Sequence, residues 1–243
     1  MMQALLHPGD TVNNSDGGSR KGCAVPDGLG GKDPLSCLTR ELVPYASHYC
    51  EENVYKLTEK LYADCGLPGD DVFVVFVSNT SKQVPIWMQR LSGGDADNPV
   101  VWDYHVFAFV ATAITTTTTI HNGWVYDSDT LLPYPCPAKQ YVLESFRPQV
   151  LLRDKYQQMF RVVPGRMFLA HFSSDRSHMK DVTSGGGSLP PPPWPPIRGA
   201  QAASAMELPK YWRMDVGDAS ETAVDSIGTV MDLVAFAAFV GAK

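Results

Sequence analysis

Apolar residues recur with a helical spacing in one part of the chain. Val54, Leu57 and Leu61 follow one another at i, i+3 and i+7, which places them on one face of an α-helix. Cys50 stands just before this run, and Gly66 just after it is typical of a helix end. The pattern predicts a helix of roughly four turns that begins at Cys50.

Further segments carry the β-branched and aromatic residues typical of strands. Val72–Val77 predicts a short buried strand, and Val84–Met88 is predicted to be its hairpin partner. Val100–Ile114 is the longest stretch with strand character, and Trp124–Asp129 predicts another strand. Thr115–Thr119 is therefore expected at or near the tip of a hairpin.

The last third of the chain mixes short helices and strands. Ala138–Phe146 and Leu151–Gln158 predict short helices, and Phe160–Val163 predicts a strand. Gly165–His171 is predicted to be a loop or a helical turn, and Gly228–Val240 a strand followed by an apolar helix. Because strands and helices do not alternate as βαβ units, we expect an α+β fold, a mostly antiparallel sheet with helices packed on it.

Length and composition favour one domain behind a long leader. The chain has 243 residues, of which 44% are hydrophobic, enough for one sizeable core. Residues 1–36 include a stretch rich in Gly, Asn, Ser and Asp and are predicted to be a disordered leader. Residues 37–243 are predicted to form a single catalytic domain. Within it the Gly/Pro-rich segment 184–197 is expected to be a bend followed by an extended strap on the surface.

Charge and cysteine content argue against several kinds of partner. A net charge of −6 without a dense Lys/Arg run argues against nucleic acid and anionic membranes. The five cysteines lack CxxC spacing and are odd in number, so neither a disulfide framework nor a zinc site is indicated, and a reducing compartment is expected. The longest apolar run, Leu233–Val240, is far shorter than the ~20 residues of a membrane span.

Cys50 is the first candidate for chemistry because it opens the predicted helix. The positive end of a helix and its unpaired N–H groups favour thiolate over thiol, so the pKa of a cysteine there is expected to be lowered. A cysteine nucleophile is commonly found in such a position. The commoner role of a lone cysteine, that of a small buried apolar residue, stays open from this segment alone.

Two further residues complete a possible catalytic set. A thiolate that attacks a carbonyl needs an imidazole partner, and the imidazole needs a third group to fix its tautomer. Cys50, His105 and Asp127 supply these groups in that order. Asp103, which shares the strand face of His105, and Asp129, which shares that of Asp127, are alternative orienting groups.

The register of the predicted hairpin decides how Asp127 meets His105. If the two stand directly opposite each other, the hairpin tip falls within the threonine run. Asn122-Gly123 is the stronger two-residue turn signal, and a tight turn there would place His105 opposite Gln140. The sequence leaves both registers open.

Several uncommon strings occur in a fixed order along the chain. They are Tyr49-Cys50-Glu51-Glu52-Asn53, Pro85-Ile86-Trp87, Val101-Trp102-Asp103-Tyr104-His105-Val106, Tyr126-Asp127-Ser128-Asp129-Thr130 with Leu132-Pro133, and Ser174-Asp175-Arg176-Ser177-His178-Met179-Lys180-Asp181. Together they resemble the protein N-terminal glutamine amidohydrolase family. The resemblance extends from about Tyr49 to Pro196, with a weaker match in the C-terminal helix.

The resemblance implies a fold, an activity and a location. It implies a monomeric cysteine hydrolase of papain- and transglutaminase-like architecture that acts on proteins or peptides with an N-terminal glutamine. The product would be N-terminal glutamate and ammonia, formed through a γ-glutamyl thioester in the arginine branch of the N-degron pathway. Cys50, His105 and Asp127 match the triad of this family. No cofactor, metal, nucleic acid or membrane is implied, and we expect the cytoplasm, with the nucleus as a second location.

Two questions stay open at this stage. The α-ammonium group of such a substrate needs an acceptor, and the candidates are Glu51, Glu52, Asp103 and Asp175. The same triad also serves a cysteine protease or a transglutaminase, and a catalytically inactive module that recognises N-termini is a further alternative. Release of ammonia from a peptide that begins with glutamine distinguishes these readings.

Overall fold

The computed structural model describes residues 38–69, 71–114, 121–179, 190–215 and 227–242. The predicted leader, the threonine run and residues 184–189 of the Gly/Pro-rich segment lie outside this part of the chain. No helix among the described residues has the length and apolar character needed to cross a bilayer.

The central element is a six-stranded antiparallel sheet with the strand order β10-β7-β1-β4-β5-β6. Its strands are, in that order, Thr229–Asp232, Met159–Pro164, Val72–Ser78, Tyr104–Ile114, His121–Tyr126 and Cys136–Pro137. Two small sheets accompany it, one of β2 (Val84–Ile86) with β3 (Val100–Trp102) and one of β8 (Ser173–Ser174) with β9 (Ile197–Arg198). The predicted α+β class with a mostly antiparallel sheet is confirmed.

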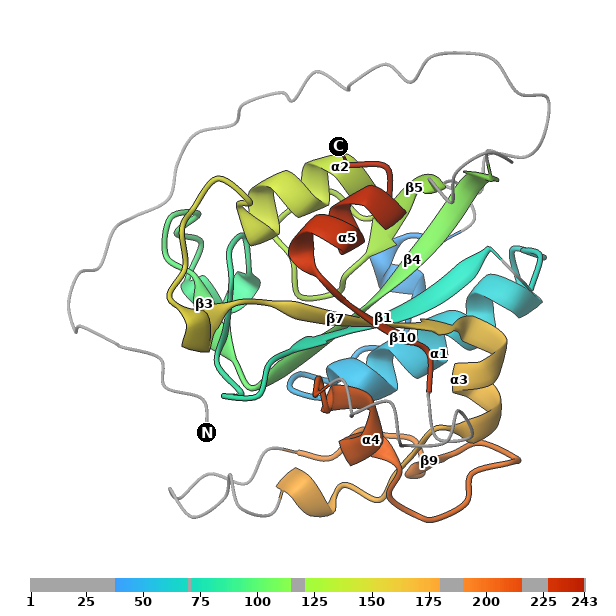
Figure 1. Ribbon diagram of the computed structural model, residues 1–243. Coiled ribbons are helices and arrows are strands. Elements are labelled where there is room, and N and C mark those ends of the chain that lie inside the picture. The colour runs from blue at the N-terminus through green and yellow to red at the C-terminus, as the bar shows by residue number, and fades with distance from the viewer. Residues whose placement is uncertain (1–37, 70, 115–120, 180–189, 216–226, 243) are drawn as a thin grey trace, which may run out of the picture.

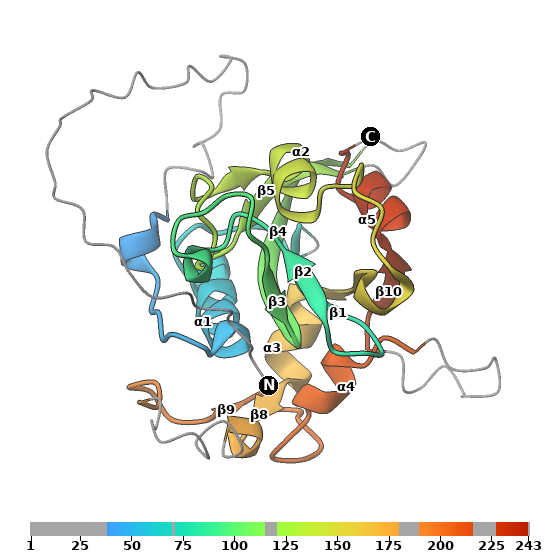
Figure 2. The same cartoon turned by 90° about the vertical axis from the view of Figure 1, so that its left-hand side faces the viewer.

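Helices cover both faces of the sheet (Figure 1). The helices α1 (Cys50–Ala63), α3 (Gly165–His171) and α4 (Leu208–Trp212) lie on one face. The helices α2 (Ala138–Tyr141) and α5 (Leu233–Phe239) lie on the other, as the turned view also shows (Figure 2). The sheet is therefore the middle of three layers.

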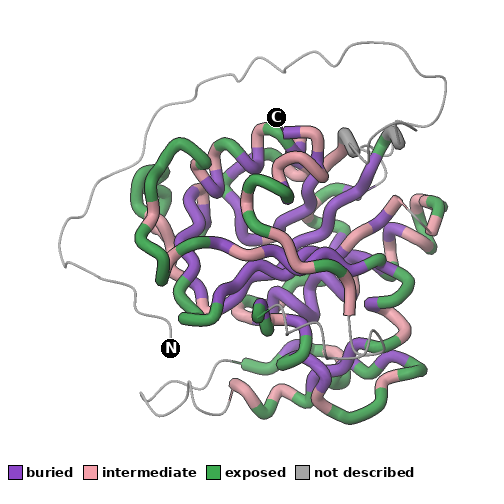
Figure 3. The backbone as a smooth tube through the Cα atoms, in the orientation of Figure 1, coloured by how far each residue is buried: buried purple, intermediate pink, exposed green. Residues whose placement is uncertain are grey.

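The alternation of side chains along the strands creates two apolar cores. In β1, Val74 and Phe76 belong to the core beneath α1, whereas Val75 and Val77 belong to the core beneath α5. All four are 0% exposed, which explains why this stretch reads as a continuous apolar run. Figure 3 shows the same burial along the centre of the sheet.

Most of the predicted helices and strands are confirmed. The helix does begin at Cys50, and the predicted apolar stripe on it is buried. The strands predicted over 72–77 and 160–163 are β1 and β7, and the strand and helix over 228–240 are β10 and α5. Residues 138–146 are helical, with a π-helical turn after α2.

The helix predicted over 151–158 is wrong. A three-residue 3-10 helix, Asp154–Tyr156, forms there, and Leu151 is 98% exposed, so the segment has no apolar face to bury.

The predicted pairing of β1 with residues 84–88 is wrong. The strand β2 pairs with β3, and β1 lies between β4 and β7. The chain leaves the main sheet because the Asn79 side chain holds a turn. Its Oδ1 accepts a hydrogen bond from the N–H of Gln83, and its Nδ2 donates to the carbonyls of Gln83, Lys155 and Gln157, each at 3.0 Å.

The long strand predicted over 100–114 is interrupted at Asp103. The Asp103 carboxylate accepts the N–H of Tyr104 at 2.9 Å, and its carbonyl accepts the Ser78 hydroxyl at 2.6 Å. The interruption separates β3 from β4 and changes the alternation of faces. A continuous strand would place Trp102 on the face opposite His105. Trp102 instead stacks on the His105 ring, with 4.7 Å between ring centroids.

The hairpin of β4 and β5 has a register that differs from both predicted ones. Ala108 pairs with Tyr126, and continuing this register places Asp129 opposite His105. Direct opposition of His105 and Asp127 is therefore wrong by two residues. Asp127 instead occupies the diagonal position, which still lies on the same face and within reach of a long side chain.

The tight turn predicted at Asn122-Gly123 is also wrong, since both residues lie within β5. Gly123 pairs with Ala111, next to a register shift in β4. A Cβ atom at position 123 would collide with the carbonyl oxygen of Val110. The glycine therefore serves a close approach of two backbones rather than a turn.

Candidate active site

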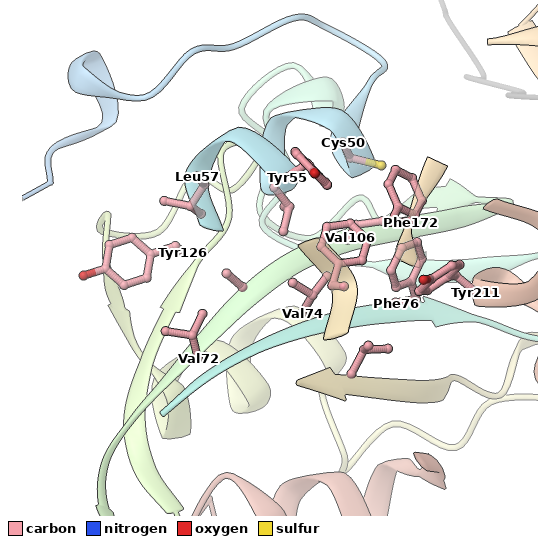
Figure 4. Close-up of a cluster of buried hydrophobic side chains, with 14 of the residues drawn as sticks. Cys50, Tyr55, Leu57, Val72, Val74, Phe76, Val106, Tyr126, Phe172 and Tyr211 are labelled. Atoms are coloured by element: carbon pink, nitrogen blue, oxygen red, sulfur yellow. The ribbon is translucent and has the colours of Figure 1, made fainter. Parts of the chain in front are cut away.

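Cys50 is the first residue of α1, and its thiol points toward β4 (Figure 4). The preceding segment is fixed by the Asn53 side chain, which accepts the N–H of Ala46 and donates to the Ala46 carbonyl, both at 2.8 Å. His48 adopts a left-handed φ of 69°, which turns the chain just before the helix. The Cys50 side chain is buried, at 6% exposure, and is hydrogen-bonded by the backbone of Val106.

His105 and Asp127 form a buried pair at the same end of the sheet. The Nε2 atom of His105 lies 3.0 Å from Oδ1 of Asp127, and both side chains are 0% exposed. His105 directly precedes Val106, the residue whose backbone contacts the Cys50 thiol. The three residues predicted from the sequence are therefore neighbours in space.

Other groups hold the Asp127 carboxylate in place. The Tyr141 hydroxyl donates to Oδ2 at 2.8 Å, the Gln89 amide donates to Oδ2 at 3.3 Å, and the Asp129 N–H donates to Oδ1 at 2.9 Å. Tyr141 and Gln89 were missed by the sequence reasoning, because nothing in their local pattern distinguishes them from ordinary core and loop residues. They fix the orientation of Asp127 and, through it, that of His105.

The imidazole is oriented so that one nitrogen stays available. Trp102 stacks on the ring, and Asp127 holds Nε2. Within the described part of the chain, the buried Nδ1 atom has no hydrogen-bond partner. A buried polar atom without a partner is uncommon and marks a position where another group is expected to bind or react.

The Cys50 thiol does not have the lowered pKa expected from its place at the helix start. Burial raises the pKa well above its ordinary value, and the negative charges of Glu51, Asp129 and Asp103 raise it further. The hydrogen bond from the Val106 backbone acts in the opposite direction but does not outweigh them. The Cys50 thiol is therefore neutral at rest, and a base would be needed to convert it to a thiolate.

His105 is suited to accept that proton. Burial disfavours the charged imidazolium, but the charge and hydrogen bond of Asp127, together with the charge of Asp129, raise the pKa of His105. Burial likewise disfavours an ionised Asp127, but the charge and hydrogen bond of His105 outweigh it and lower the pKa of Asp127. The pair therefore stabilises the imidazolium that forms when His105 accepts the thiol proton.

The two alternative orienting groups have other partners. Asp129 accepts a hydrogen bond from the Tyr45 hydroxyl at 2.6 Å, and burial raises its pKa. The Oδ1 atom of Asp103 accepts the N–H of Tyr104. Among the three aspartates, only Asp127 is hydrogen-bonded to His105 within the described residues.

A second polar cluster lies on the other side of Cys50. Glu51 is 0% exposed, and its Oε2 atom lies 3.7 Å from the Cys50 sulfur and accepts the Tyr104 hydroxyl at 3.0 Å. Its Oε1 atom lies 3.6 Å from Nε2 of His178, and the Tyr104 hydroxyl lies 3.3 Å from the same nitrogen. Burial, followed by the charge of Glu52, raises the pKa of Glu51 to about 7.

Glu52, in contrast to Glu51, is fully hydrogen-bonded. Both of its oxygens are occupied, by the Arg176 guanidinium at 2.8 and 2.9 Å and by the Trp194 indole N–H at 2.7 Å. Arg176 also donates to the Trp194 carbonyl at 2.8 Å. The part of the predicted strap that contains Trp194 is thus attached to the helix that carries Cys50.

Among the described residues, His105, Asp127 and Asp129 form a group whose spacing could hold a metal ion. One ligand atom from each lies within 4.8 Å of the others. The Asp127 oxygens are already engaged by His105, Asp129, Tyr141 and Gln89, an arrangement typical of an orienting carboxylate.

Neither of the other two cysteines that the structure describes opens a helix. Cys136 is a free thiol, 0% exposed, and burial raises its pKa to about 12. Cys65 is disulfide-bonded, which the cysteine spacing did not indicate. Of the two free thiols among the described residues, Cys50 alone stands at the start of a helix beside His105.

Comparison with known proteins places this chain in a family. The model of the N-terminal glutamine amidase family matches residues 45–240, which include Cys50, His105 and Asp127. The chain belongs to the N-terminal glutamine amidase family. A protein N-terminal glutamine amidohydrolase of Danio rerio is 41% identical over 171 residues, 70% of this chain and 79% of the relative. That of Homo sapiens is 38% identical over 176 residues (72% and 80%), and that of Drosophila melanogaster 42% over 153 residues (63% and 71%).

Proposed function

We propose that this chain hydrolyses the side-chain amide of an N-terminal glutamine in a protein or peptide, with release of ammonia. The observation that carries the proposal is the buried His105–Asp127 pair next to a helix-initiating Cys50, in a chain of the N-terminal glutamine amidase family. The names of the relatives describe this reaction for those proteins. We further propose that the glutamate product feeds the arginine branch of the N-degron pathway.

The first half of the reaction uses Cys50 and His105. Nδ1 of His105 takes the thiol proton of Cys50, and the thiolate attacks the side-chain amide carbon of the glutamine. The imidazolium, stabilised by Asp127, then gives its proton to the departing amino group, which leaves as ammonia. The product of this half is a γ-glutamyl thioester on Cys50.

The second half reverses the roles. His105 takes a proton from a water molecule, which attacks the thioester carbon, and the proton then returns to the Cys50 sulfur as the glutamate product leaves. In both halves a tetrahedral oxyanion forms. The N–H of Cys50, one of the first N–H groups of α1 and therefore without an intrahelical acceptor, is the donor we assign to that oxyanion.

Ammonia release from four peptides with a common tail tests the proposal. The peptides begin with Gln, Asn, acetyl-Gln and Ala-Gln, and the first should be the good substrate. Asparagine is one methylene shorter, and a displacement on the order of 1 Å costs about 10²-fold. Comparable rates on the last two peptides would favour a general, transglutaminase-like glutaminase, and release of a peptide would indicate a protease.

Variants of the nucleophile complete this test. Cys50→Ala and Cys50→Ser should release no ammonia while keeping the wild-type circular dichroism spectrum. Cys136→Ala is the matched control, because Cys136 is the other free buried thiol and has no place in the mechanism. A Cys50→Ala protein that retains turnover would remove Cys50 from the reaction. The expected monomeric state and the cytoplasmic and nuclear location stay predictions.

A further inference from the structure

Next to the proposed nucleophile lies a carboxylate that the mechanism does not use. Glu51 is 0% exposed, and its Oε1 atom has no hydrogen-bond partner within the described part of the chain. A buried carboxylate oxygen without a donor is costly, because folding removes the water that would otherwise bind it. Such a feature calls for a ligand that supplies the missing donor.

We infer that Glu51 is the residue that binds the α-ammonium group of the substrate, which gives the enzyme its requirement for a free N-terminus. The inference rests on the proposed function. An ammonium group supplies both the hydrogen-bond donor and the positive charge that Oε1 lacks. An acetylated or internal glutamine supplies neither and would leave Oε1 buried without a partner.

Distances support this assignment. In glutamine, four bonds separate the α-nitrogen from the side-chain amide carbon, so the two atoms are at most about 5 Å apart. The Glu51 carboxylate lies 3.7 Å from the Cys50 sulfur through Oε2. A glutamine with its ammonium on Oε1 can therefore place its amide carbon at the roughly 3–3.5 Å needed for attack by the thiolate.

The other candidate carboxylates are less suited to this role. Glu52 is saturated by Arg176 and Trp194. Asp175 is exposed, and it accepts the N–H of Ser177. Asp103 accepts the N–H of Tyr104.

Tyr104 and His178 complete the subsite. The Tyr104 hydroxyl fixes Oε2 of Glu51, which aims the carboxylate, and the His178 ring lies next to Oε1 with its own Nδ1 unpaired among the described residues. The 3.6 Å distance between Oε1 and Nε2 leaves no room for a nitrogen atom on the line between them, so the ammonium group is expected to reach Oε1 from beside the ring. The His178 side chain is 13% exposed and that of Glu51 is 0% exposed, so the ring lies nearer to solvent than the carboxylate.

The test compares a peptide beginning with glutamine with its desamino counterpart, in which hydrogen replaces the α-ammonium group. Wild-type enzyme should prefer the glutamine peptide in kcat/KM by about 10²-fold, the usual loss when one member of a buried charged pair is removed. Glu51→Gln should lose this preference, because KM for the glutamine peptide rises, whereas turnover of the desamino peptide, which has no ammonium group to bind, should not fall. Asp103→Asn, the same chemical change at a rival carboxylate, should keep the preference.

The outcomes separate the possible roles of Glu51. If Glu51→Gln lowers turnover of both peptides equally, Glu51 acts on the reacting atoms and the inference is wrong. If Asp103→Asn abolishes the preference and Glu51→Gln does not, the ammonium binds elsewhere. Tyr104→Phe, which frees the carboxylate but leaves its charge, gives a second measurement and should reduce the preference by a smaller factor.

Binding measurements make the test independent of turnover. Calorimetry on Cys50→Ala should show tighter binding of the glutamine peptide than of the desamino peptide, and the double variant Cys50→Ala/Glu51→Gln should bind both alike. If wild-type enzyme releases no ammonia but this binding difference is found, the proposed reaction fails and the ammonium subsite stands. Equal binding of the two peptides to Cys50→Ala would overturn the subsite.

Discussion

Replacing Glu51 by glutamine should make the protein more stable, and increasingly so as the pH rises. The substitution keeps the shape of the side chain and removes a charge from a fully buried position. Burial raises the pKa of Glu51 from 4.5 to about 7, and the charge of Glu52 adds to this effect. Hydrogen bonds from Tyr104 and Cys50 oppose the rise without cancelling it.

The magnitude follows from the difference in proton binding between the folded and unfolded protein. Between pH 4.5 and about 7, the folded protein keeps the Glu51 proton and the unfolded chain releases it. The unfolded state therefore binds fewer protons, and stability falls as the pH rises through this range. A pKa difference of about 2.5 corresponds to about 3 kcal/mol, most of which develops between pH 5 and pH 8.

Guanidinium unfolding at pH 5 and pH 8 measures this difference. The gap in free energy of unfolding between Glu51→Gln and wild type should widen by about 2–3 kcal/mol from the lower to the higher pH. Glu59→Gln is the matched control, since Glu59 lies on the same helix but its side chain is 45% exposed and pairs with Lys56 at the surface. Its effect should stay below about 1 kcal/mol at both pH values. A constant gap for Glu51→Gln would show that Glu51 ionises as an ordinary carboxylate.

Three further outcomes are expected. Asp127→Asn should lower kcat by up to ~10⁴-fold, the loss described for the orienting aspartate of serine proteases. Asp103→Asn should lower kcat less, because Asp103 bonds Tyr104 and not His105. Equal losses of kcat in a peptide assay would show that Asp127 is not the only orienting group. Glu51→Gln should lower the pKa of the Cys50 thiol, and at pH 8 each unit of that fall should speed alkylation of Cys50 by iodoacetamide about tenfold. Mass spectrometry measures this rate, with alkylation of Cys136 as the reference. An unchanged rate would contradict the coupling of the Glu51 and Cys50 side chains. Gly123→Ala should destabilise by about 1–3 kcal/mol in thermal unfolding, because the new Cβ meets the Val110 carbonyl, and a wild-type midpoint would show that the strands separate freely.

Elements that depend on local periodicity could be predicted from the sequence. The stripe of Val54, Leu57 and Leu61 predicted α1, and the apolar run of β1 predicted a buried strand. The pairing of strands was harder to predict from the sequence, because it depends on contacts between side chains that are distant in sequence. The side-chain amide of Asn79 donates hydrogen bonds to the carbonyls of Lys155 and Gln157 and directs the chain away from β1. The local sequence around Asn79 gives no indication of these two partners.

For the candidate site, residue types were easier to predict than geometry. Cys50, His105 and Asp127 were identified as a set, but His105 and Asp127 approach diagonally because Ala108 pairs with Tyr126, a register that the sequence did not settle. The expected lowering of the Cys50 pKa was wrong, because position at a helix start was visible in the sequence and the depth of burial was not. Because the depth of burial was not visible in the sequence, the Oε1 atom of Glu51 could not be recognised as a buried oxygen without a hydrogen-bond donor.

The two effects of Glu51 connect substrate recognition with formation of the nucleophile. Burial is the largest cause of the raised pKa of the Cys50 thiol, and the negative charge of Glu51 is the second largest. An ionised Glu51 therefore opposes formation of the thiolate that the reaction needs. An ammonium group bound at Oε1 would compensate that charge at a carboxylate 3.7 Å from the sulfur, and proton transfer from Cys50 to His105 would become easier. Glutamine at position 51 removes the opposing charge permanently, and with it the site that reads the N-terminus. A variant with a more reactive cysteine and a weaker preference for free N-termini is therefore the combined result that this arrangement of charges requires.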